Sequence, residues 1–206
     1  MPSPPKIFDA DSRSKNPSHE QVDCIVLAAG LSTRAQGWKM ILPFGDSTVI
    51  ESTVKTALSI CSRVVLVTGY RAAELTQLFS SCSQVTPVYN PKFQKGMFGS
   101  IQVGVRQVTT PRFFIALGDM PLVSPATYKL MMETEIPDAC IPQYRGRSGH
   151  PVLLSSSLAA PILDSGGSAT LRDILHGRAV KRVGVNDRFV LHDIDTPEDY
   201  KTLREE

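Results

Sequence analysis

CIVLAAGLSTRAQGWKMILPFG, residues 24–45, is the segment from which the architecture of this chain can be inferred. It begins with an apolar run, Cys24–Ala29, which contains β-branched residues and is followed by Gly30. A short apolar run without polar alternation, closed by glycine, is typical of a strand that is buried on both faces. The segment therefore predicts a buried strand that enters a tight turn.

The loop after this strand has the composition of an anion-binding loop. It contains four small residues, Gly30, Ser32, Thr33 and Gly37. Small residues allow backbone N–H groups to approach an anion closely. Two cations, Arg34 and Lys39, lie in the same segment. We therefore expect this loop to bind a polyphosphate.

Strand and helix patterns alternate downstream of the loop. Apolar residues at helical spacing predict a helix over residues 50–58, and a buried apolar run predicts a strand over residues 63–68. A short helix around residues 75–79 and strands over residues 85–90 and 112–117 follow. This order is typical of right-handed βαβ units, whose ligands bind beyond the carboxyl ends of the strands.

The second half of the chain adds strands to the predicted sheet. Strand-like runs over residues 139–143 and 149–154 predict a hairpin inserted into the sheet. Two last strands are predicted over residues 183–185 and 189–194, and Pro87 places its own strand at an edge. The expected fold class is α/β, a Rossmann-like three-layer sandwich with a mostly parallel sheet.

Polar residues mark the starts of the later helices. Ser100 and Ser124 are predicted N-caps, and residues 155–177 are expected to be helical in two pieces. Thr196 is the predicted N-cap of the final helix, and Asp199 three residues later gives nearly a capping box.

The composition favours one domain of ordinary character. Residues 1–20 are rich in proline, serine and charge and predict a flexible tail, which leaves residues 21–206 as a single domain. A net charge of +2 does not indicate a nucleic-acid surface. No apolar run approaches the roughly 18 residues that span a bilayer, and no signal peptide is recognisable. We therefore expect a cytoplasmic protein without nucleic-acid or membrane partners.

Carboxylates lie at the ends of two of the predicted strands. Asp119 comes directly after the strand over residues 112–117, and Asp193 and Asp195 alternate so that both would point to one face of a strand. Converging carboxylates repel one another unless a cation lies between them, and a divalent metal ion would relieve this repulsion. Asp195 is the first choice for a ligand beside Asp119, although Asp119 could instead cap a turn.

Five motifs, taken in order, resemble those of one enzyme family. They are L-A-A-G-x-S-x-R-x-x-x-x-K with L-P-F-G (residues 27–45), Gly96-Met97-x-x-Ser100-Ile101, Gly118–Pro121, Gly149–Val152 and Asp193–Asp199. Together they resemble the MobA/MocA-like nucleotidyltransferases over roughly residues 22–203. The resemblance implies that a phosphate oxygen of an acceptor attacks the α-phosphorus of a nucleoside triphosphate and that pyrophosphate leaves.

The resemblance also implies roles for individual residues. Arg34, Lys39 and Asp119 would be catalytic through positioning and charge neutralisation. Asp119 and Asp195 would hold Mg²⁺. The implied nucleotide-binding residues are Leu27, Ala28, Ala29, Gly30, Ser32, Arg34, Lys39, Gly96, Met97 and Ser100.

Two segments are similar to the cytidylyltransferase branch of the family, Ala28-Ala29-Gly30 and Gly96-Met97-x-x-Ser100. This similarity implies CTP as the donor, molybdopterin carrying molybdenum as the acceptor, and a molybdenum hydroxylase as the client. His150 in the G-H-P motif and Arg172 would contact the acceptor. The alternatives are a turn histidine with a satisfied ring and a solvated surface arginine.

Three other functions stay open. A GTP-dependent molybdopterin guanylyltransferase would use the same fold. Residues 167–172 depart from the stretch that is common in the cofactor cytidylyltransferases, so the acceptor could also be a sugar phosphate. A non-catalytic chaperone that binds the cofactor for a molybdenum hydroxylase would need no pyrophosphate release.

Overall fold

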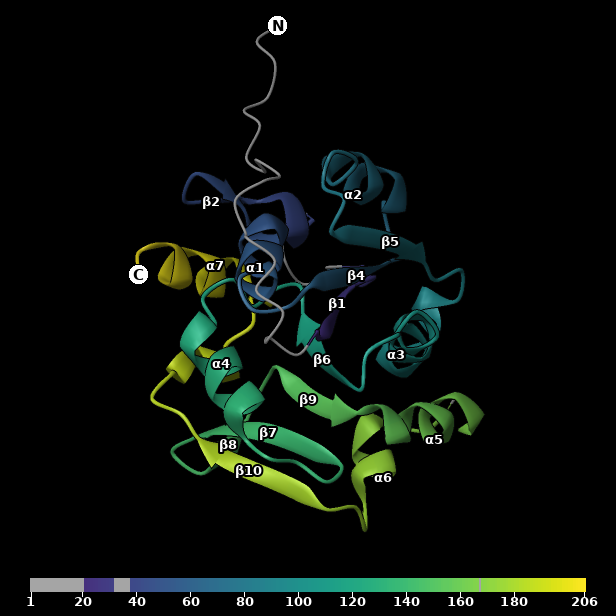
Figure 1. Cartoon of the computed structure of the whole chain (residues 1–206). Helices are drawn as coiled ribbons and strands as arrows, with labels where there is room; N and C mark the ends of the chain where they lie inside the picture. Colours follow the sequence, from purple (N-terminus) through teal and green to yellow (C-terminus); the bar gives the residue numbers. More distant parts are fainter. Residues whose placement is uncertain (1–20, 32–37, 167) are drawn as a thin grey trace, which may run out of the picture.

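One mixed sheet of eight strands forms the centre of the molecule (Figure 1). The computed structural model describes residues 21–31, 38–166 and 168–206, so the tail predicted over residues 1–20 lies outside it. The strand order is β10-β7-β9-β6-β1-β4-β5, and β8 pairs with β7. The strands of this sheet are β1 (Asp23–Ala28), β4 (Arg63–Thr68), β5 (Val85–Tyr89), β6 (Arg112–Leu117), β7 (Ala139–Tyr144), β8 (Arg147–Ser148), β9 (Val152–Ser155) and β10 (Val180–Gly184). A separate antiparallel pair consists of β2 (Pro43–Phe44) and β3 (Ser47–Thr48).

Parallel pairing surrounds β1. This strand pairs in parallel with β4 and β6, and β4 pairs in parallel with β5, as β10 does with β7. The antiparallel pairs are β6 with β9, β7 with β9 and β7 with β8. The predicted α/β fold with a mostly parallel sheet is therefore confirmed. The predicted hairpin is part of the main sheet, because β9 lies between β6 and β7.

Helices cover both faces of the sheet and make three layers (Figure 1). α1 and α4 pack on one face, and α3, α5 and α6 pack on the other. The helices are α1 (Val49–Leu58), α2 (Ala72–Leu78), α3 (Met97–Val105), α4 (Pro125–Glu133), α5 (Ala159–Asp164), α6 (Leu171–Leu175) and α7 (Pro197–Arg204), with single 3₁₀ turns η1 (Lys39–Ile41), η2 (Phe93–Lys95), η3 (Ser156–Leu158) and η4 (Arg188–Leu191). Within the described ranges, every helix is too short or too polar to traverse a bilayer.

β1 separates two apolar cores. Its alternate residues Cys24, Val26 and Ala28 pack on the α1 side of the sheet. Ile25 and Leu27 pack on the α3 side. A strand with helices on both faces needs apolar side chains at successive positions, which is why this segment shows no polar alternation.

Several predicted boundaries agree with the structure. β4 and β6 have the predicted bounds, and β5, which contains Pro87, is an edge strand. α4 begins at Pro125 with Ser124 as its N-cap. Thr196 caps α7, and its side chain and that of Asp199 form a capping box. Each of these signals is local, so neighbouring residues were sufficient to predict it.

The strand predicted over residues 189–194 is wrong. η4 begins at Arg188, and the described residues 192–195 belong to no strand. The physical reason is Asp187, whose side chain accepts a hydrogen bond from the Phe189 N–H at 3.0 Å and so starts a helical turn. The strand predicted over residues 183–185 is present as β10, which begins three residues earlier.

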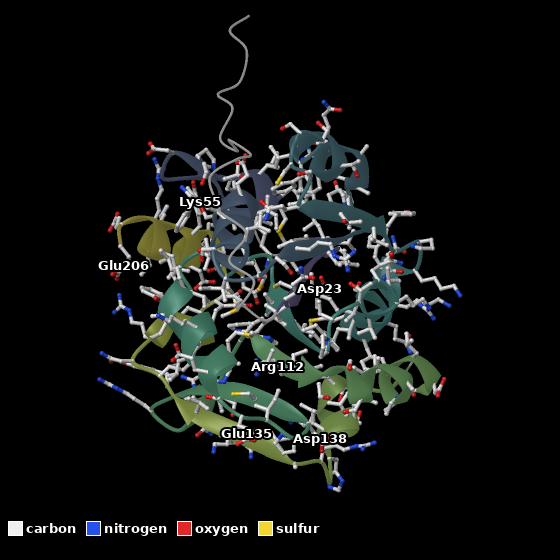
Figure 2. The ribbon with its side chains drawn as sticks, viewed as in Figure 1. Asp23, Lys55, Arg112, Glu135, Asp138 and Glu206 are labelled. Carbon is white, nitrogen blue, oxygen red and sulfur yellow. The ribbon has the colours of Figure 1, made fainter. Side chains whose placement is uncertain are left out.

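A buried carboxylate ties β1 to two neighbouring segments. Asp23 is 2% exposed and lies in the interior (Figure 2). It accepts hydrogen bonds from Nε and Nη2 of Arg63 at 3.0 and 2.8 Å, and from the Thr109 N–H at 2.9 Å. Burial raises the pKa of Asp23. Arg63 lowers this pKa through its hydrogen bonds and its charge, Thr109 lowers it through its hydrogen bonds, and together they outweigh the effect of burial. The pKa of Asp23 therefore lies below its ordinary value.

Asp23→Asn is expected to lower the free energy of unfolding by about 2 kcal/mol at neutral pH, because the Arg63 charge loses its partner. A carboxyl whose pKa is lowered by folding stabilises the protein above its unfolded pKa of about 3.9. That stabilisation is lost as the pH falls through the lower folded pKa. Urea titrations at neutral pH and near pH 3 should show that the difference between the two proteins shrinks in acid. A difference that is the same at both pH values would contradict the role of the ionised carboxylate.

Candidate active site

A pocket of about 490 Å³ opens at the carboxyl ends of β1 and β6. Six segments line it: the end of β1, η1, the loop between β5 and α3, the first turns of α3, the end of β6 and the segment before α7. The lining residues are Leu27, Ala29, Gly30, Leu31, Lys39, Met40, Phe93, Gln94, Gly96, Met97, Ser100, Leu117, Asp119, Asp193 and Asp195. Ligands of open α/β sheets bind at this edge, so the pocket is the candidate site.

Three carboxylates converge in the lining of this pocket. Asp119, Asp193 and Asp195 each place one ligand oxygen within 4.8 Å of the others. The Ile194 N–H donates to the Asp119 carbonyl oxygen at 3.0 Å, which holds residues 193–195 beside the end of β6. The expected convergence is present, although an irregular segment provides it instead of the predicted strand.

A buried lysine faces this cluster. Lys39 is 8% exposed, and its Nζ lies 2.5 Å from Oδ2 of Asp119 and 3.1 Å from Oδ1 of Asp195. Burial lowers the pKa of Lys39, but the two carboxylates raise it by more, so the ammonium group stays charged at neutral pH. Burial raises the pKa of Asp119, and Lys39 only partly opposes this. Lys39 is therefore the counter-ion of the cluster.

The donor atoms of the cluster fit a divalent metal ion. Among the residues that the structure describes, three carboxylates converge beside the ammonium group of Lys39, so the cluster is rich in negative charge. Carboxylate oxygens are the ligands that hard cations such as Mg²⁺ and Mn²⁺ prefer. Asp119, Asp193 and Asp195 are the residues that could hold such an ion.

Aromatic packing restrains the segment that carries Lys39. Trp38 is 6% exposed and directly precedes η1. The guanidinium carbon of Arg71 lies 4.6 Å from the centre of the Trp38 ring, and Tyr70 meets the same ring edge-on at a centroid distance of 6.2 Å. Cation–π and edge-to-face contacts of this kind favour one ring orientation. They therefore help to hold Lys39 in front of the carboxylates.

The prediction that Ser100 caps a helix is wrong. α3 begins at Met97, and its N-cap is Gly96, whose φ of 109° lies in a region that favours glycine. Ser100 lies inside α3, where its hydroxyl accepts a hydrogen bond from Nδ2 of Asn90 at 2.9 Å. Gly96 and Met97 still place the N-terminus of α3 in the wall of the pocket.

Gly69 allows the pocket wall to lie against the end of β1. A Cβ atom at this position would be 2.6 Å from the Ala29 carbonyl oxygen and 2.6 Å from Cβ of Phe93. The Tyr70 N–H donates to the same Ala29 oxygen at 3.2 Å, so the backbone cannot withdraw without losing this bond. A side chain at position 69 would therefore displace Phe93.

Gly69→Ala is expected to weaken binding of a nucleoside triphosphate in the pocket about tenfold and to lower the free energy of unfolding by about 2 kcal/mol. Gly166→Ala is the matched control, because a Cβ atom at Gly166 would meet nothing within 4 Å in the part of the chain that the structure describes, its chain neighbours aside. Calorimetric titration and urea unfolding would measure both effects. Equal affinities of the two variants would show that the contact with Phe93 does not shape the pocket.

The pocket brings together most of the residues that the sequence indicated. These are Leu27, Ala29, Gly30, Lys39, Gly96, Met97, Ser100, Asp119 and Asp195. Ser32 and Arg34, predicted for the anion-binding loop, lie outside the described residues. Their contact with phosphate stays a prediction.

Three other predicted residues do not line the pocket. The side chain of Ala28 is fully buried in the core on the α1 side. His150 packs near β6, where burial lowers the pKa of its ring below the ordinary value although the Ile115 backbone and the charge of Asp193 oppose this. Arg172 is exposed on α6. Neither of the two predicted acceptor contacts is therefore part of the lining of this pocket.

Part of the lining was missed by the sequence analysis. The missed residues are Leu31, Met40, Phe93, Gln94, Leu117 and Asp193. Asp193 belongs to the D-x-D pattern, from which only Asp195 is predicted as a ligand. Phe93 and Gln94 carry no chemical signal of their own, and only their position just before the Gly96-Met97 motif could have indicated them.

Residues 24–183 match the family described as MobA-like NTP transferase domain. The chain is 34% identical over 184 residues to the molybdenum cofactor cytidylyltransferase of Escherichia coli (strain K12), and the match covers 89% of this chain and 96% of that protein.

Solved structures show the same fold. A nucleotidyl transferase from Methanothermobacter superimposes with a TM-score of 0.79 at 27% identity, covering 90% of this chain and 96% of that chain. Rv0371c from Mycobacterium tuberculosis H37Rv, solved in complex with manganese, superimposes with a TM-score of 0.70 at 27% identity and covers 90% of this chain and 98% of that chain.

Proposed function

Because this chain belongs to the family of MobA-like NTP transferase domains and is thus a nucleotidyltransferase, we propose that it transfers CMP from CTP to molybdopterin carrying molybdenum, with release of pyrophosphate. The donor and acceptor rest on the similarity to the cytidylyltransferase of Escherichia coli. The whole of residues 21–206 would act as one catalytic domain. We further propose that it works in the cytoplasm and supplies a molybdenum hydroxylase.

The observation that carries the proposal is the group of three carboxylates facing Lys39 in the pocket at the carboxyl edge of the sheet. Asp119 and Asp195 would hold Mg²⁺, and Asp193 is a third candidate ligand. When bound, the ion would neutralise phosphate charge and orient the reacting phosphate groups. Manganese in the structure of Rv0371c supports a divalent ion in this fold.

The nucleotide would lie along the pocket from its charged cluster to its apolar wall. Lys39 would bind phosphate oxygens, and Arg34 and Ser32 would do the same from the loop before it. Leu27, Gly96, Met97 and Ser100 would surround the nucleoside, with the backbone of residues 28–30 beside it. A base is flat and uncharged, so it is suited to the apolar part of this lining.

In the proposed reaction, an oxygen of the acceptor phosphate attacks the α-phosphorus of CTP. A new O–P bond forms to the acceptor, the bond between the α-phosphorus and the bridging oxygen breaks, and that oxygen leaves with pyrophosphate. Lys39 and Arg34 would hold the charge that develops on the leaving group. No protein nucleophile is required, so the chain contributes positioning and charge.

His150 and Arg172 remain proposed acceptor contacts. Because neither lines the pocket, they would meet only those parts of a long acceptor that extend beyond it. The exposed position of Arg172 would suit a phosphate or carboxylate, whereas the buried ring of His150 would act mainly by shaping the rim.

The test is pyrophosphate release from CTP, GTP, ATP and UTP, each with Mg²⁺ and with molybdopterin carrying molybdenum as acceptor. We expect CTP to be turned over fastest and a chelator of divalent metals to stop the reaction. Faster turnover of GTP would identify a guanylyltransferase. Nucleotide binding without pyrophosphate release would exclude transfer to this acceptor, and a panel of sugar phosphates would then separate an enzyme with another acceptor from a cofactor-binding chaperone.

A further inference from the structure

Asn90 is a buried residue whose hydrogen bonds join the sheet to the pocket loop and to α3. It directly follows β5 and is 2% exposed. Its N–H donates to the Thr68 carbonyl at the end of β4 at 2.8 Å, and its Oδ1 accepts from the Lys92 N–H at 2.9 Å. Its Nδ2 donates to the hydroxyl of Ser100 at 2.9 Å. Asn90 therefore fixes the start of the loop to the first turns of α3.

These bonds also fix the direction of the contact with Ser100. Oδ1 of Asn90 must face Lys92, because the opposite orientation of the amide would place an NH₂ group against a backbone N–H. The NH₂ group therefore faces Ser100, and the Ser100 oxygen accepts that bond. A serine hydroxyl has a single proton, and Asn90 leaves this proton free to be donated elsewhere.

The proton that Asn90 leaves unused on Ser100 is available to a ligand in the pocket. Ser100 is 3% exposed and belongs to the pocket lining, next to apolar residues that include Leu27, Phe93 and Met97. Among the residues that the structure describes, its hydroxyl donates to no backbone carbonyl. A buried hydroxyl that keeps its proton unused loses hydrogen-bond energy, and an acceptor on a bound ligand would recover it. The apolar surroundings favour a neutral acceptor over a phosphate.

We propose that Asn90 is a positioning residue that holds the Ser100 hydroxyl as a hydrogen-bond donor to an acceptor atom on the nucleoside part of the substrate. The inference rests on the proposed function, because it assumes that a nucleoside triphosphate occupies the pocket. Asn90 itself need not touch the nucleotide. Asn90 donates to the Ser100 oxygen, so the Ser100 proton stays available for an acceptor atom on the ligand.

Asn90→Asp tests this direction with little change of shape. A carboxylate at position 90 still accepts from Lys92 but can no longer donate, so the Ser100 proton turns toward it and only lone pairs face the pocket. Ser100→Ala removes the hydroxyl altogether. Asn186→Asp is the matched control, since Asn186 is exposed and does not line the pocket.

The measurement is calorimetric affinity for CTP and for inorganic tripolyphosphate, each with Mg²⁺. Tripolyphosphate carries the phosphate charge without a nucleoside, so it reports any electrostatic or structural damage that the substitution causes. We expect Asn90→Asp and Ser100→Ala each to lower the affinity for CTP, relative to tripolyphosphate, about tenfold. The double variant should lose no more than either single variant. KM for CTP should rise while kcat changes little.

Several results would overturn the inference. An equal loss for CTP and tripolyphosphate would show that Asn90 only supports the fold of the loop. An unchanged ratio in Ser100→Ala would show that the hydroxyl donates to no nucleoside atom. If thermal melting shows that Asn90→Asp does not fold, Ser100→Cys provides the test instead. A thiol has a similar shape but is a weak donor, so this variant should also lose affinity for CTP relative to tripolyphosphate.

The same titrations separate this inference from the proposed function. If the wild-type protein prefers GTP, ATP or UTP, the CTP assignment fails, and the variants are compared with that nucleotide instead. If the wild-type protein binds no nucleotide more tightly than tripolyphosphate, both proposals fail. If it prefers a nucleotide and Asn90→Asp keeps that preference, only the inference about Asn90 fails.

Discussion

Asp119→Asn is expected to reduce pyrophosphate release from CTP about a thousandfold. The substitution keeps the size of the side chain but removes one of three carboxylates that converge in the pocket. It also removes the nearest negative charge from Nζ of Lys39, which lies 2.5 Å away. A metal ion would lose a charged ligand, and Lys39 would turn to Asp195 alone. The initial rate with saturating CTP and acceptor would measure the effect.

Asp164→Asn is the matched control for this experiment, because Asp164 is exposed at the end of α5. Binding of Mn²⁺, followed by electron paramagnetic resonance, gives an independent reading of the site. Since burial raises the pKa of Asp119, the wild-type protein should lose Mn²⁺ affinity as the pH falls through that raised pKa. A variant that retains Mn²⁺ affinity and more than a tenth of the rate would exclude Asp119 as a ligand.

Lys39→Met is expected to have opposite effects on metal binding and on turnover. Lys39 would compete with a metal ion for Asp119 and Asp195, so its removal should raise the affinity for Mn²⁺ about tenfold. The same change removes a cation that would hold the triphosphate, so pyrophosphate release should fall about a hundredfold. Titration with Mn²⁺ and the release assay measure the two effects separately.

The same variant should be unstable without metal. Loss of Lys39 removes a cation from three converging carboxylates, which should lower the free energy of unfolding by about 3 kcal/mol. Mn²⁺ should restore most of this loss and should stabilise Lys39→Met more than the wild-type protein. Lys55→Met serves as the control, because Lys55 is exposed on α1 (Figure 2). An unchanged Mn²⁺ affinity in Lys39→Met would contradict the competition.

A strand of the sheet could be predicted from the sequence wherever its own residues were sufficient to indicate both the strand and its ends. β1, β4 and β6 are buried on both faces, so their apolar runs are continuous and their ends are marked by polar or glycine residues. The capping box of Thr196 and Asp199 is likewise complete within four residues. These elements needed no knowledge of distant parts of the chain.

Elements that depend on distant partners could not be predicted in the same way. Asp187 starts η4 and is itself held by the Ser124 N–H and the Thr127 hydroxyl, more than fifty residues away. The D-x-D pattern predicted that Asp193 and Asp195 would converge with Asp119 from a strand; the side chains do converge, but residues 193–195 belong to no strand. Their position depends on the bond between Ile194 and the end of β6, which no local pattern reveals.

Trp38 gives this protein an optical probe of its own pocket. It is the only tryptophan in the chain, and it is covalently joined to the residue whose ammonium faces the carboxylates. Its indole is buried beneath the Arg71 guanidinium, so its surroundings are charged and well defined. Indole emission responds to nearby charge and to water. Any ligand that draws Lys39 away from Asp119 should therefore shift the intrinsic fluorescence, and binding kinetics can be followed in the unlabelled protein.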